Sequence, residues 1–102
     1  YHRLAGAMDA LPIHQVSIED AHCRNDLDLL GLFQNTAVIF GSVAVARSRV
    51  ETVDEVVERI RDAQQHIDRE RLVIAPDCGL GMLTRDLAVA KLDVMCRAAA
   101  LA

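Results

Sequence analysis

The sequence has very few aromatic residues and no tryptophan. Tyr1, Phe33 and Phe40 are its only aromatic side chains, so the core must be built mainly from Val, Leu, Ile and Ala. Aromatic and basic side chains do not interleave as a nucleic-acid groove requires, and the net charge of −4 leaves no basic footprint. We therefore expect no nucleic-acid partner.

Long apolar runs and dense cysteine patterns are also missing. No stretch approaches the roughly 18 apolar residues of a membrane-spanning helix, and no charged-then-apolar leader marks secretion. Three cysteines, Cys23, Cys78 and Cys96, are an odd number and too few for a disulfide scaffold. These absences favour a cytoplasmic protein with reduced thiols and no membrane partner.

Three apolar segments of the chain are predicted to be β-strands. They cover residues 14–19, 36–45 and 71–75. The second, TAVIFGSVAV, is a continuous β-branched run, which is typical of a strand buried on both faces. We expect the third, RLVIA, to be buried in the same way.

Helical patterns flank and separate these strands. They cover residues 1–11, 25–33, 52–67 and a last segment that Thr84 can cap. In the second, Leu27, Leu30 and Phe33 lie on one side, with Asn25 or Asp26 as the cap. The third is the clearest, because Thr52 and Glu55 form a T-x-x-E capping box ahead of an apolar stripe.

Two expectations concern the remaining faces of these helices. We expect a solvated face opposite the apolar stripe of the third helix, made of Asp54, Glu58, Arg59, Arg61 and Asp62. The last helix is expected to have one apolar face, which is made of Leu87, Ala90, Val94, Met95 and Ala98. Cys96, inside that helix, is expected to be a core residue.

The order α-β-α-β-α-β-α predicts an α/β fold with a parallel sheet. Right-handed crossovers place the carboxyl ends of the strands on one edge, where such folds hold their chemistry. Three strands are too few for a finished doubly wound sheet or for a closed barrel of about 250 residues. Because two open sheet edges are a liability, and the chain starts without Met inside a helical pattern, we expect a partial domain.

Two residues with metal-binding side chains follow the predicted strands. Glu19 ends the first strand, and Cys78 follows the third within the turn Pro76-Asp77-Cys78-Gly79. A carboxylate and a thiolate on one rim supply half of a four-coordinate zinc site. From spacing alone, a small core residue remains the commoner role for such a cysteine. Asp77 is expected to bond the loop backbone, and His22 and Cys23 to be loop residues rather than added ligands.

Three segments carry a resemblance to a known family: VSIEDA, FGSVAVARSRVETVDEVVERIRDA and ERLVIAPDCGLGMLTRDLAVAKLDVM. They resemble the C-terminal catalytic domain of cobalamin-independent methionine synthase, most specifically at Pro76-Asp77-Cys78-Gly79. The resemblance implies that residues 1–102 are the C-terminal part of one TIM-barrel catalytic domain, namely the last three strands of a (β/α)8 barrel with their helices. It also implies that Glu19 and Cys78 bind Zn²⁺, with a His-x-Cys pair just upstream of Tyr1.

The reaction implied by this resemblance is zinc-dependent methyl transfer. A methyl group would move from polyglutamylated 5-methyltetrahydrofolate to homocysteine, forming methionine, and zinc would lower the pKa of the homocysteine thiol. The implied partners are therefore small molecules, homocysteine or another thiol and a methyl-folate. Because the rest of the barrel is needed upstream, we expect the isolated 102 residues to be inactive and poorly behaved.

One departure from the family pattern leaves the catalytic residue unassigned. Where the family has Asp-[Val/Ile]-His with a proton-donating histidine, an ungapped alignment places Ala44, Val45 and Ala46. Two alternatives therefore stay open. One is another zinc-thiolate alkyl transfer, such as those acting on coenzyme M, and the other is a non-catalytic α/β fragment or interaction module.

Overall fold

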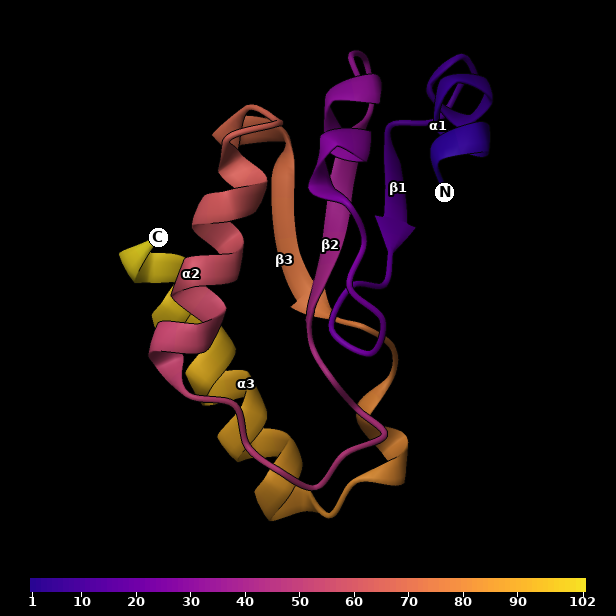
Figure 1. The fold of residues 1–102 in the computed structure, drawn as a ribbon. Helices are drawn as coiled ribbons and strands as arrows, with labels where there is room; N and C mark the ends of the chain where they lie inside the picture. Colours follow the sequence, from indigo (N-terminus) through magenta and orange to yellow (C-terminus); the bar gives the residue numbers. More distant parts are fainter.

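Three parallel strands form the central sheet in the order β1-β2-β3 (Figure 1). They are β1 (Gln15–Ile18), β2 (Ala37–Val43) and β3 (Leu72–Pro76). The computed structural model describes all of residues 1–102. Both strand pairs are parallel, so all three carboxyl ends lie at the same edge. The predicted α/β class with a parallel sheet is confirmed.

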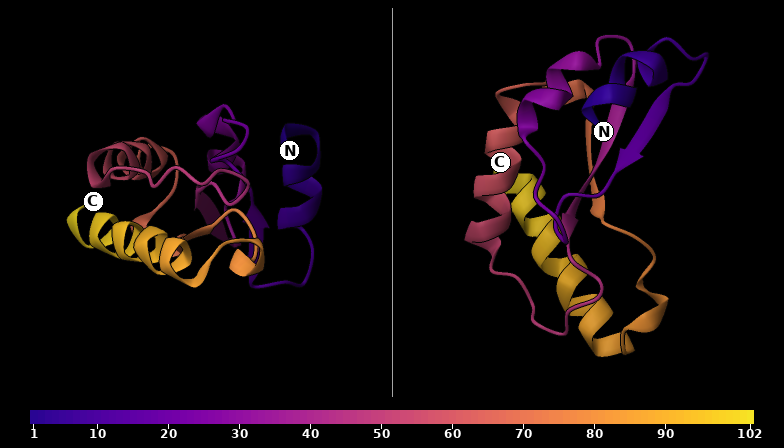
Figure 2. Two further views of the ribbon diagram at one scale, coloured as in Figure 1. Left: turned by 90° about the horizontal axis from the view of Figure 1, so that it is seen from below. Right: turned by 45° about the vertical axis from the view of Figure 1, so that its right-hand side comes forward.

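Three α-helices accompany the sheet: α1 (His2–Asp9), α2 (Val53–Gln64) and α3 (Arg85–Leu101). Figure 2 shows α2 and α3 side by side, with α1 near the opposite edge of the sheet, beside β1. The capping box at the start of α2 is confirmed, because the Thr52 side chain accepts from Glu55 N and the Glu55 side chain accepts from Thr52 N. None of the helices combines the length and apolar character needed to cross a bilayer.

The predicted second helix is a shorter 3₁₀ helix, η1 (Leu27–Leu32). Asp26 caps it by accepting a hydrogen bond from Asp28 N. The prediction of an α-helix over residues 25–33 was wrong because an apolar residue at every third position also fits the three-residue turn of a 3₁₀ helix. Leu27, Leu30 and Phe33 are nevertheless buried together, as the spacing required. Two further 3₁₀ turns, η2 (Arg69–Arg71) and η3 (Leu80–Met82), flank β3.

The helices cover only one face of the sheet. Val16, Ile18, Val38 and Phe40 pack against α1, η1 and α2, while Leu72 and Ile74 pack against α2 and α3. Alternate residues of the strands point to the other face. There, Ser17 is paired with Ile39 and Ile39 with Val73. Ser17 is exposed, Ile39 is half-buried and Val73 is 40% exposed, so no helix shields this face.

Two predicted core positions are not in the core. β3 is partly exposed along its length, because it is an edge strand with a neighbour on one side only. Cys96 is exposed, because the inward face of α3 is centred on Lys91 and Ala98, the two buried residues of that helix. At 100° per residue, position 96 lies away from both.

Candidate functional site

Asp77 is the centre of a polar network at the carboxyl ends of the strands. Its carboxylate is fully buried. Asp77 Oδ1 accepts from Asp20 N at 3.1 Å and from Ala21 N at 3.0 Å, and Oδ2 accepts from His22 N at 2.8 Å. The end of β3 thus holds the loop that follows β1. This confirms the prediction that Asp77 bonds the loop backbone.

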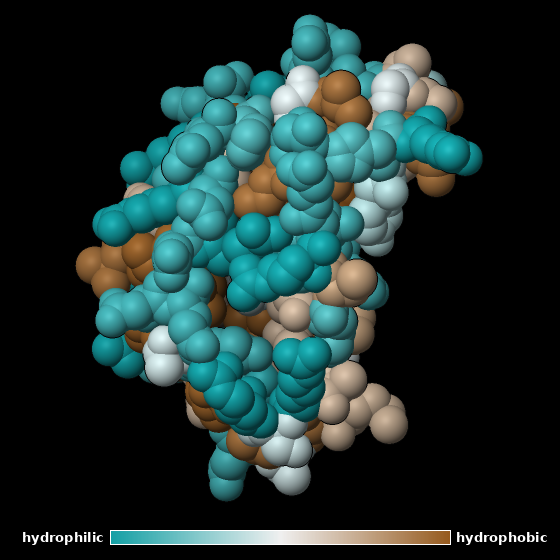
Figure 3. Space-filling model, viewed as in Figure 1, coloured by the Kyte–Doolittle hydropathy of each residue, from teal (hydrophilic) through white to brown (hydrophobic).

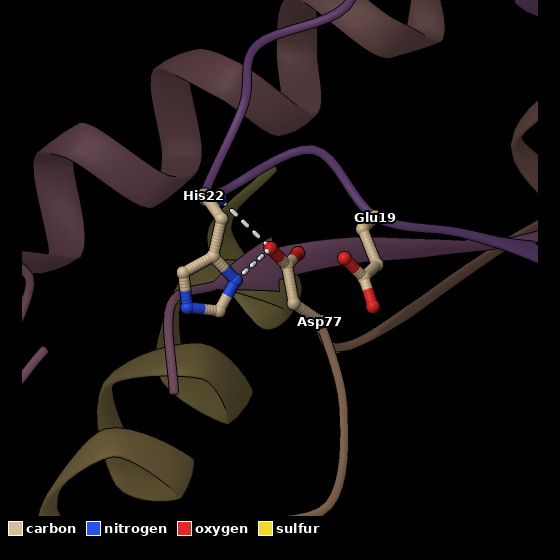
Figure 4. Close-up of side chains that lie close together, drawn as sticks. All are labelled: Glu19, His22 and Asp77. Carbon is tan, nitrogen blue, oxygen red and sulfur yellow. Dashed lines mark hydrogen bonds and ion pairs between the residues drawn. The ribbon is translucent and has the colours of Figure 1, made fainter. Parts of the chain in front are cut away.

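His22 extends this network to the end of β2. Its Nδ1 lies 2.7 Å from Asp77 Oδ2 (Figure 4), and its Nε2 accepts from Val45 N at 3.2 Å and Ala46 N at 2.8 Å. Backbone N–H groups only donate, so Nε2 is an acceptor and Nδ1 carries the proton given to Asp77. Both ring nitrogens are therefore engaged, and His22 ties together the ends of all three strands.

Gly41 makes room for Asp77 on the open face of the sheet. A Cβ atom at position 41 would lie 2.2 Å from Asp77 Oδ1 and 2.9 Å from Asp77 Cα. The second contact is with backbone, which cannot rotate away. Close approach therefore requires glycine here, next to the irregularity in register between Gly41 and Val43.

Glu19 lies beside this network without joining its hydrogen bonds. Donor atoms of Glu19, His22 and Asp77 lie within 4.8 Å of one another, which is close enough for a metal ion. Figure 4 shows the Glu19 carboxylate next to Asp77 with no bond between them. The donor atoms of Asp77 and His22 are already used in hydrogen bonds, whereas the Glu19 carboxylate is exposed and makes none. Glu19 is the member of this group whose carboxylate has no hydrogen-bond partner.

Cys78, the second predicted ligand, follows Asp77 at the same rim. Its thiol is free and exposed, so it is not the small core residue that its position alone favoured. Cys78 does not belong to the Glu19–His22–Asp77 group. The structure thus leaves two unengaged donors at the rim, the Glu19 carboxylate and the Cys78 thiol, beside a pair that is locked in place.

Arg59 forms a buried ion pair with Asp20, contrary to the prediction that its face of α2 is merely solvated. Arg59 Nε lies 2.7 Å from Asp20 Oδ2 and its Nη2 lies 2.8 Å from Asp20 Oδ1, with Asp20 1% exposed. Burial alone would raise the pKa of Asp20, but the Arg59 guanidinium and Asn25 N–H outweigh it and hold that pKa below its ordinary value. Arg59 is next to Ile60 on the apolar stripe, so it can turn inward.

A second buried pair, absent from the residues predicted from the sequence, joins α3 to the loop after β2. The fully buried Lys91 Nζ donates to Arg49 O at 2.6 Å and to both Glu51 carboxylate oxygens at 3.1 Å. Glu51 Oε1 also accepts from Ala44 N. A signal was available, because Lys91 lies four residues after Leu87 and seven before Ala98, on the apolar face of the last helix.

Ala46 occupies the position at which the resemblance implied a proton-donating histidine. The structure brings a different imidazole, that of His22, to its backbone N–H. Since both nitrogens of His22 are engaged, this ring holds the loop and has no free nitrogen with which to move a proton. Cys23, also in the loop after β1, is exposed and free.

The fold and this site define an α/β domain that has a buried polar network and unengaged donor side chains at the carboxyl ends of its parallel strands. The family model for the catalytic domain of cobalamin-independent synthase matches residues 2–101. The chain therefore belongs to the cobalamin-independent methionine synthase family.

Several methionine synthases resemble the chain. A methionine synthase of Thermococcus kodakarensis is 42% identical over 94 residues, covering 90% of this chain and 28% of the relative. One from Pyrococcus abyssi is 38% identical over 99 residues, covering 96% of this chain and 29% of the relative. The structure of a B12-independent methionine synthase from Shewanella sp. W3-18-1, in complex with selenomethionine, superposes with a TM-score of 0.93 at 25% identity, covering 99% of this chain and 30% of that one. The chain thus spans less than a third of the relatives it matches.

Proposed function

We propose that the chain is the C-terminal part of a zinc-dependent methyltransferase domain that forms methionine. The observation that carries this proposal is the pair of unengaged donors, Glu19 and Cys78, on a rim whose neighbouring side chains are fixed by hydrogen bonds. Family membership supports the reaction type. The proposed substrates are homocysteine and the methyl group of polyglutamylated 5-methyltetrahydrofolate.

The one-sided packing of the sheet supports the proposal that residues 1–102 are part of a (β/α)8 barrel. In a doubly wound fold helices cover both faces of the sheet, whereas in a barrel every helix lies outside and the other face lines the interior. Here the helices lie on one face, and the face with Ser17, Ile39 and Val73 is uncovered. The remaining barrel strands would cover that face and pair with the edges of β1 and β3.

The donor set fits zinc. A thiolate and a carboxylate are both common zinc ligands, and neither donor has a competing partner on the rim. We propose that Cys78 and Glu19 provide two ligands and that a His-x-Cys pair upstream in the full protein provides the others. Bound zinc would lower the pKa of a substrate thiol, so that a thiolate is available at neutral pH.

The other residues of the rim position these donors. Asp77 and His22 fix the backbone of residues 20–22 directly after Glu19, and Asp77 is covalently joined to Cys78. Arg59 holds the same loop from its other side through Asp20. The loop that carries one donor is therefore tied to the segment that carries the other.

Metal content of the intact protein tests the ligand assignment without relying on activity. Cys78→Ser is expected to lose most of its zinc after dialysis, and Glu19→Gln to lose part of it, as measured by mass spectrometry of the metal. Cys96→Ser is the matched control, because Cys96 is also an exposed thiol but lies on α3 away from the rim. Equal zinc content in the Cys78→Ser and Cys96→Ser proteins would show that Cys78 is not a zinc ligand.

A direct assay tests the reaction. The intact zinc-loaded protein is incubated with homocysteine and methyltetrahydrofolate triglutamate, and methionine is measured. Methionine formation that Cys78→Ser abolishes and Cys96→Ser retains would support the proposal. If zinc is bound but no methionine forms, the methyl donor is a different one. The absence of a histidine at position 46 makes this the specific alternative to examine.

A further inference from the structure

An arginine-rich cavity opens beside the rim, between the loop after β1, the loop after β2 and the start of α2. Its volume is about 80 Å³. Four of its nine lining residues are arginines, Arg24, Arg47, Arg49 and Arg59, and two are carboxylates, Glu51 and Glu55. Strongly hydrophilic side chains lie over the loop after β2 in Figure 3. We call this hollow the arginine cavity.

Both carboxylates of the arginine cavity are already neutralised. The Glu51 carboxylate accepts two hydrogen bonds from the buried Lys91 ammonium group. Glu55 is paired with Arg49, whose Nη2 lies 2.7 Å from Oε1 and 2.9 Å from Oε2. The Thr52 N–H and the Arg49 guanidinium lower the pKa of Glu55 to about 2, so this pair stays charged and matched at neutral pH.

The cations of the arginine cavity are not all matched. Arg59 is ion-paired with Asp20, and Arg49 is ion-paired with Glu55. Arg24 and Arg47 form no hydrogen bond or ion pair with any group of the chain, so two positive charges remain over a cavity large enough for a small group. Guanidinium groups match the planar, bidentate geometry of carboxylate and phosphate oxygens.

We propose that the arginine cavity is a binding site for a small oxyanion, a carboxylate or a phosphate group, held by Arg47 and Arg24. The site lies next to the His22 network, because Ala46 N donates to His22 and Arg47 is the next residue. This inference does not depend on the proposed methyl transfer, since oxyanion binding needs neither zinc nor turnover.

The surroundings of the two arginines predict unequal contributions. Arg24 also borders a neighbouring hollow of about 260 Å³ with Glu58 and Asp62, whose carboxylates do not line the arginine cavity. Arg47 borders only the arginine cavity. Arg47 is therefore expected to contribute more to binding than Arg24.

Calorimetric titration of the intact protein at constant ionic strength tests the site, with inorganic phosphate and glutarate as separate probes. The double variant Arg24→Gln/Arg47→Gln is expected to bind at least one probe about tenfold more weakly or worse, and Arg47→Gln to lose more than Arg24→Gln. Arg85→Gln is the matched control, an exposed arginine at the start of α3 without a partner. Thermal melts coincident with those of Arg85→Gln show that folding is intact.

The two probes also separate the sources of the oxyanion. Binding of phosphate that the double variant loses identifies a phosphate group, and binding of glutarate that it loses identifies a carboxylate. The proposal is overturned if neither probe binds the wild-type protein more tightly than the double variant. Loss of zinc or of methionine formation in Cys78→Ser has no bearing on this readout, so the two proposals fail independently.

Discussion

Two aspartates hold loops in the same way at opposite ends of the sheet. Asp77, after β3, accepts the N–H groups of residues 20–22 at the carboxyl ends of the strands. Asp9, at the end of α1, accepts the N–H groups of residues 34–36, just before β2 begins. Each carboxylate thus pins a three-residue segment that is distant in sequence.

The two anchors differ in burial and in what surrounds them. Asp77 is fully buried, also accepts a hydrogen bond from the His22 ring, and lies beside the exposed donors Glu19 and Cys78. Asp9 is partly exposed and has no donor cluster nearby. The same bond pattern therefore lies beside the proposed metal ligands at one end and only joins chain segments at the other. Burial makes the Asp77 bonds the more costly ones to lose, because unpaired backbone groups there cannot turn to water.

The largest effect that we expect comes from removing the buried anchor. Asp77→Ala leaves the N–H groups of residues 20–22 without an acceptor, and His22 Nδ1 without a partner. We expect a loss of about 3–5 kcal/mol in the free energy of unfolding of the intact protein. Amide hydrogen exchange at residues 20–22 should accelerate together with this loss, as measured by mass spectrometry.

A matched substitution isolates the role of this carboxylate. Asp62→Ala removes an exposed carboxylate on α2 that has no hydrogen-bond partner, and should change stability by at most about 0.5 kcal/mol. If Asp77→Ala and Asp62→Ala unfold at the same denaturant concentration, Asp77 is not an anchor. Unchanged exchange at residues 20–22 in Asp77→Ala would contradict the proposed contacts directly.

A medium effect is expected from crowding the buried anchor instead of removing it. Gly41→Ala places a methyl group against Asp77 Oδ1 and Cα, and overpacking of this kind costs about 1–3 kcal/mol. Gly6→Ala is the control, since a Cβ at position 6 meets nothing within 4 Å and lies in α1. The control should be neutral or stabilising by up to about 1 kcal/mol. Denaturant melts in which both variants match the wild type would show that Asp77 has room to move.

The order of elements could be predicted from the sequence because local patterns determine it. The capping box at Thr52 and Glu55 marks the start of α2, and the apolar run over residues 36–45 marks β2. The type of η1 could not be decided, since apolar residues spaced by three fit either kind of helix. The exposure of β3 and of Cys96 depended on which faces have neighbours, and a local pattern does not contain that information.

The rim was only partly predictable, for the same reason. Parallel strands place Glu19 and Cys78 at one edge, so both candidate ligands followed from topology and resemblance, and their role in zinc binding stays a prediction. The bond between His22 and Asp77 joins residues 55 positions apart, and no spacing rule links two loops at that distance. Lys91, on α3, was overlooked although the sequence held a signal, because a lysine on an apolar helix face is rarely buried without a partner.

The smallest effect is expected at Asp9, the partly exposed anchor, and it should depend on pH. Desolvation alone would raise the pKa of Asp9, but the N–H groups of residues 34–36 outweigh it and lower the pKa from 3.8 to about 2. A lowered pKa stabilises the fold above pH 4, and this contribution fades as the pH falls towards 2. Asp9→Asn should therefore be less stable than the wild type at pH 6, and this loss should be smaller than that of Asp77→Ala. The difference in stability between Asp9→Asn and the wild type should shrink between pH 4 and pH 2. Urea melts of the intact protein at each pH measure this difference in stability, with Asp62→Asn as the control. If the difference between Asp9→Asn and the wild type stays constant with pH, the charge of Asp9 does not hold the loop before β2.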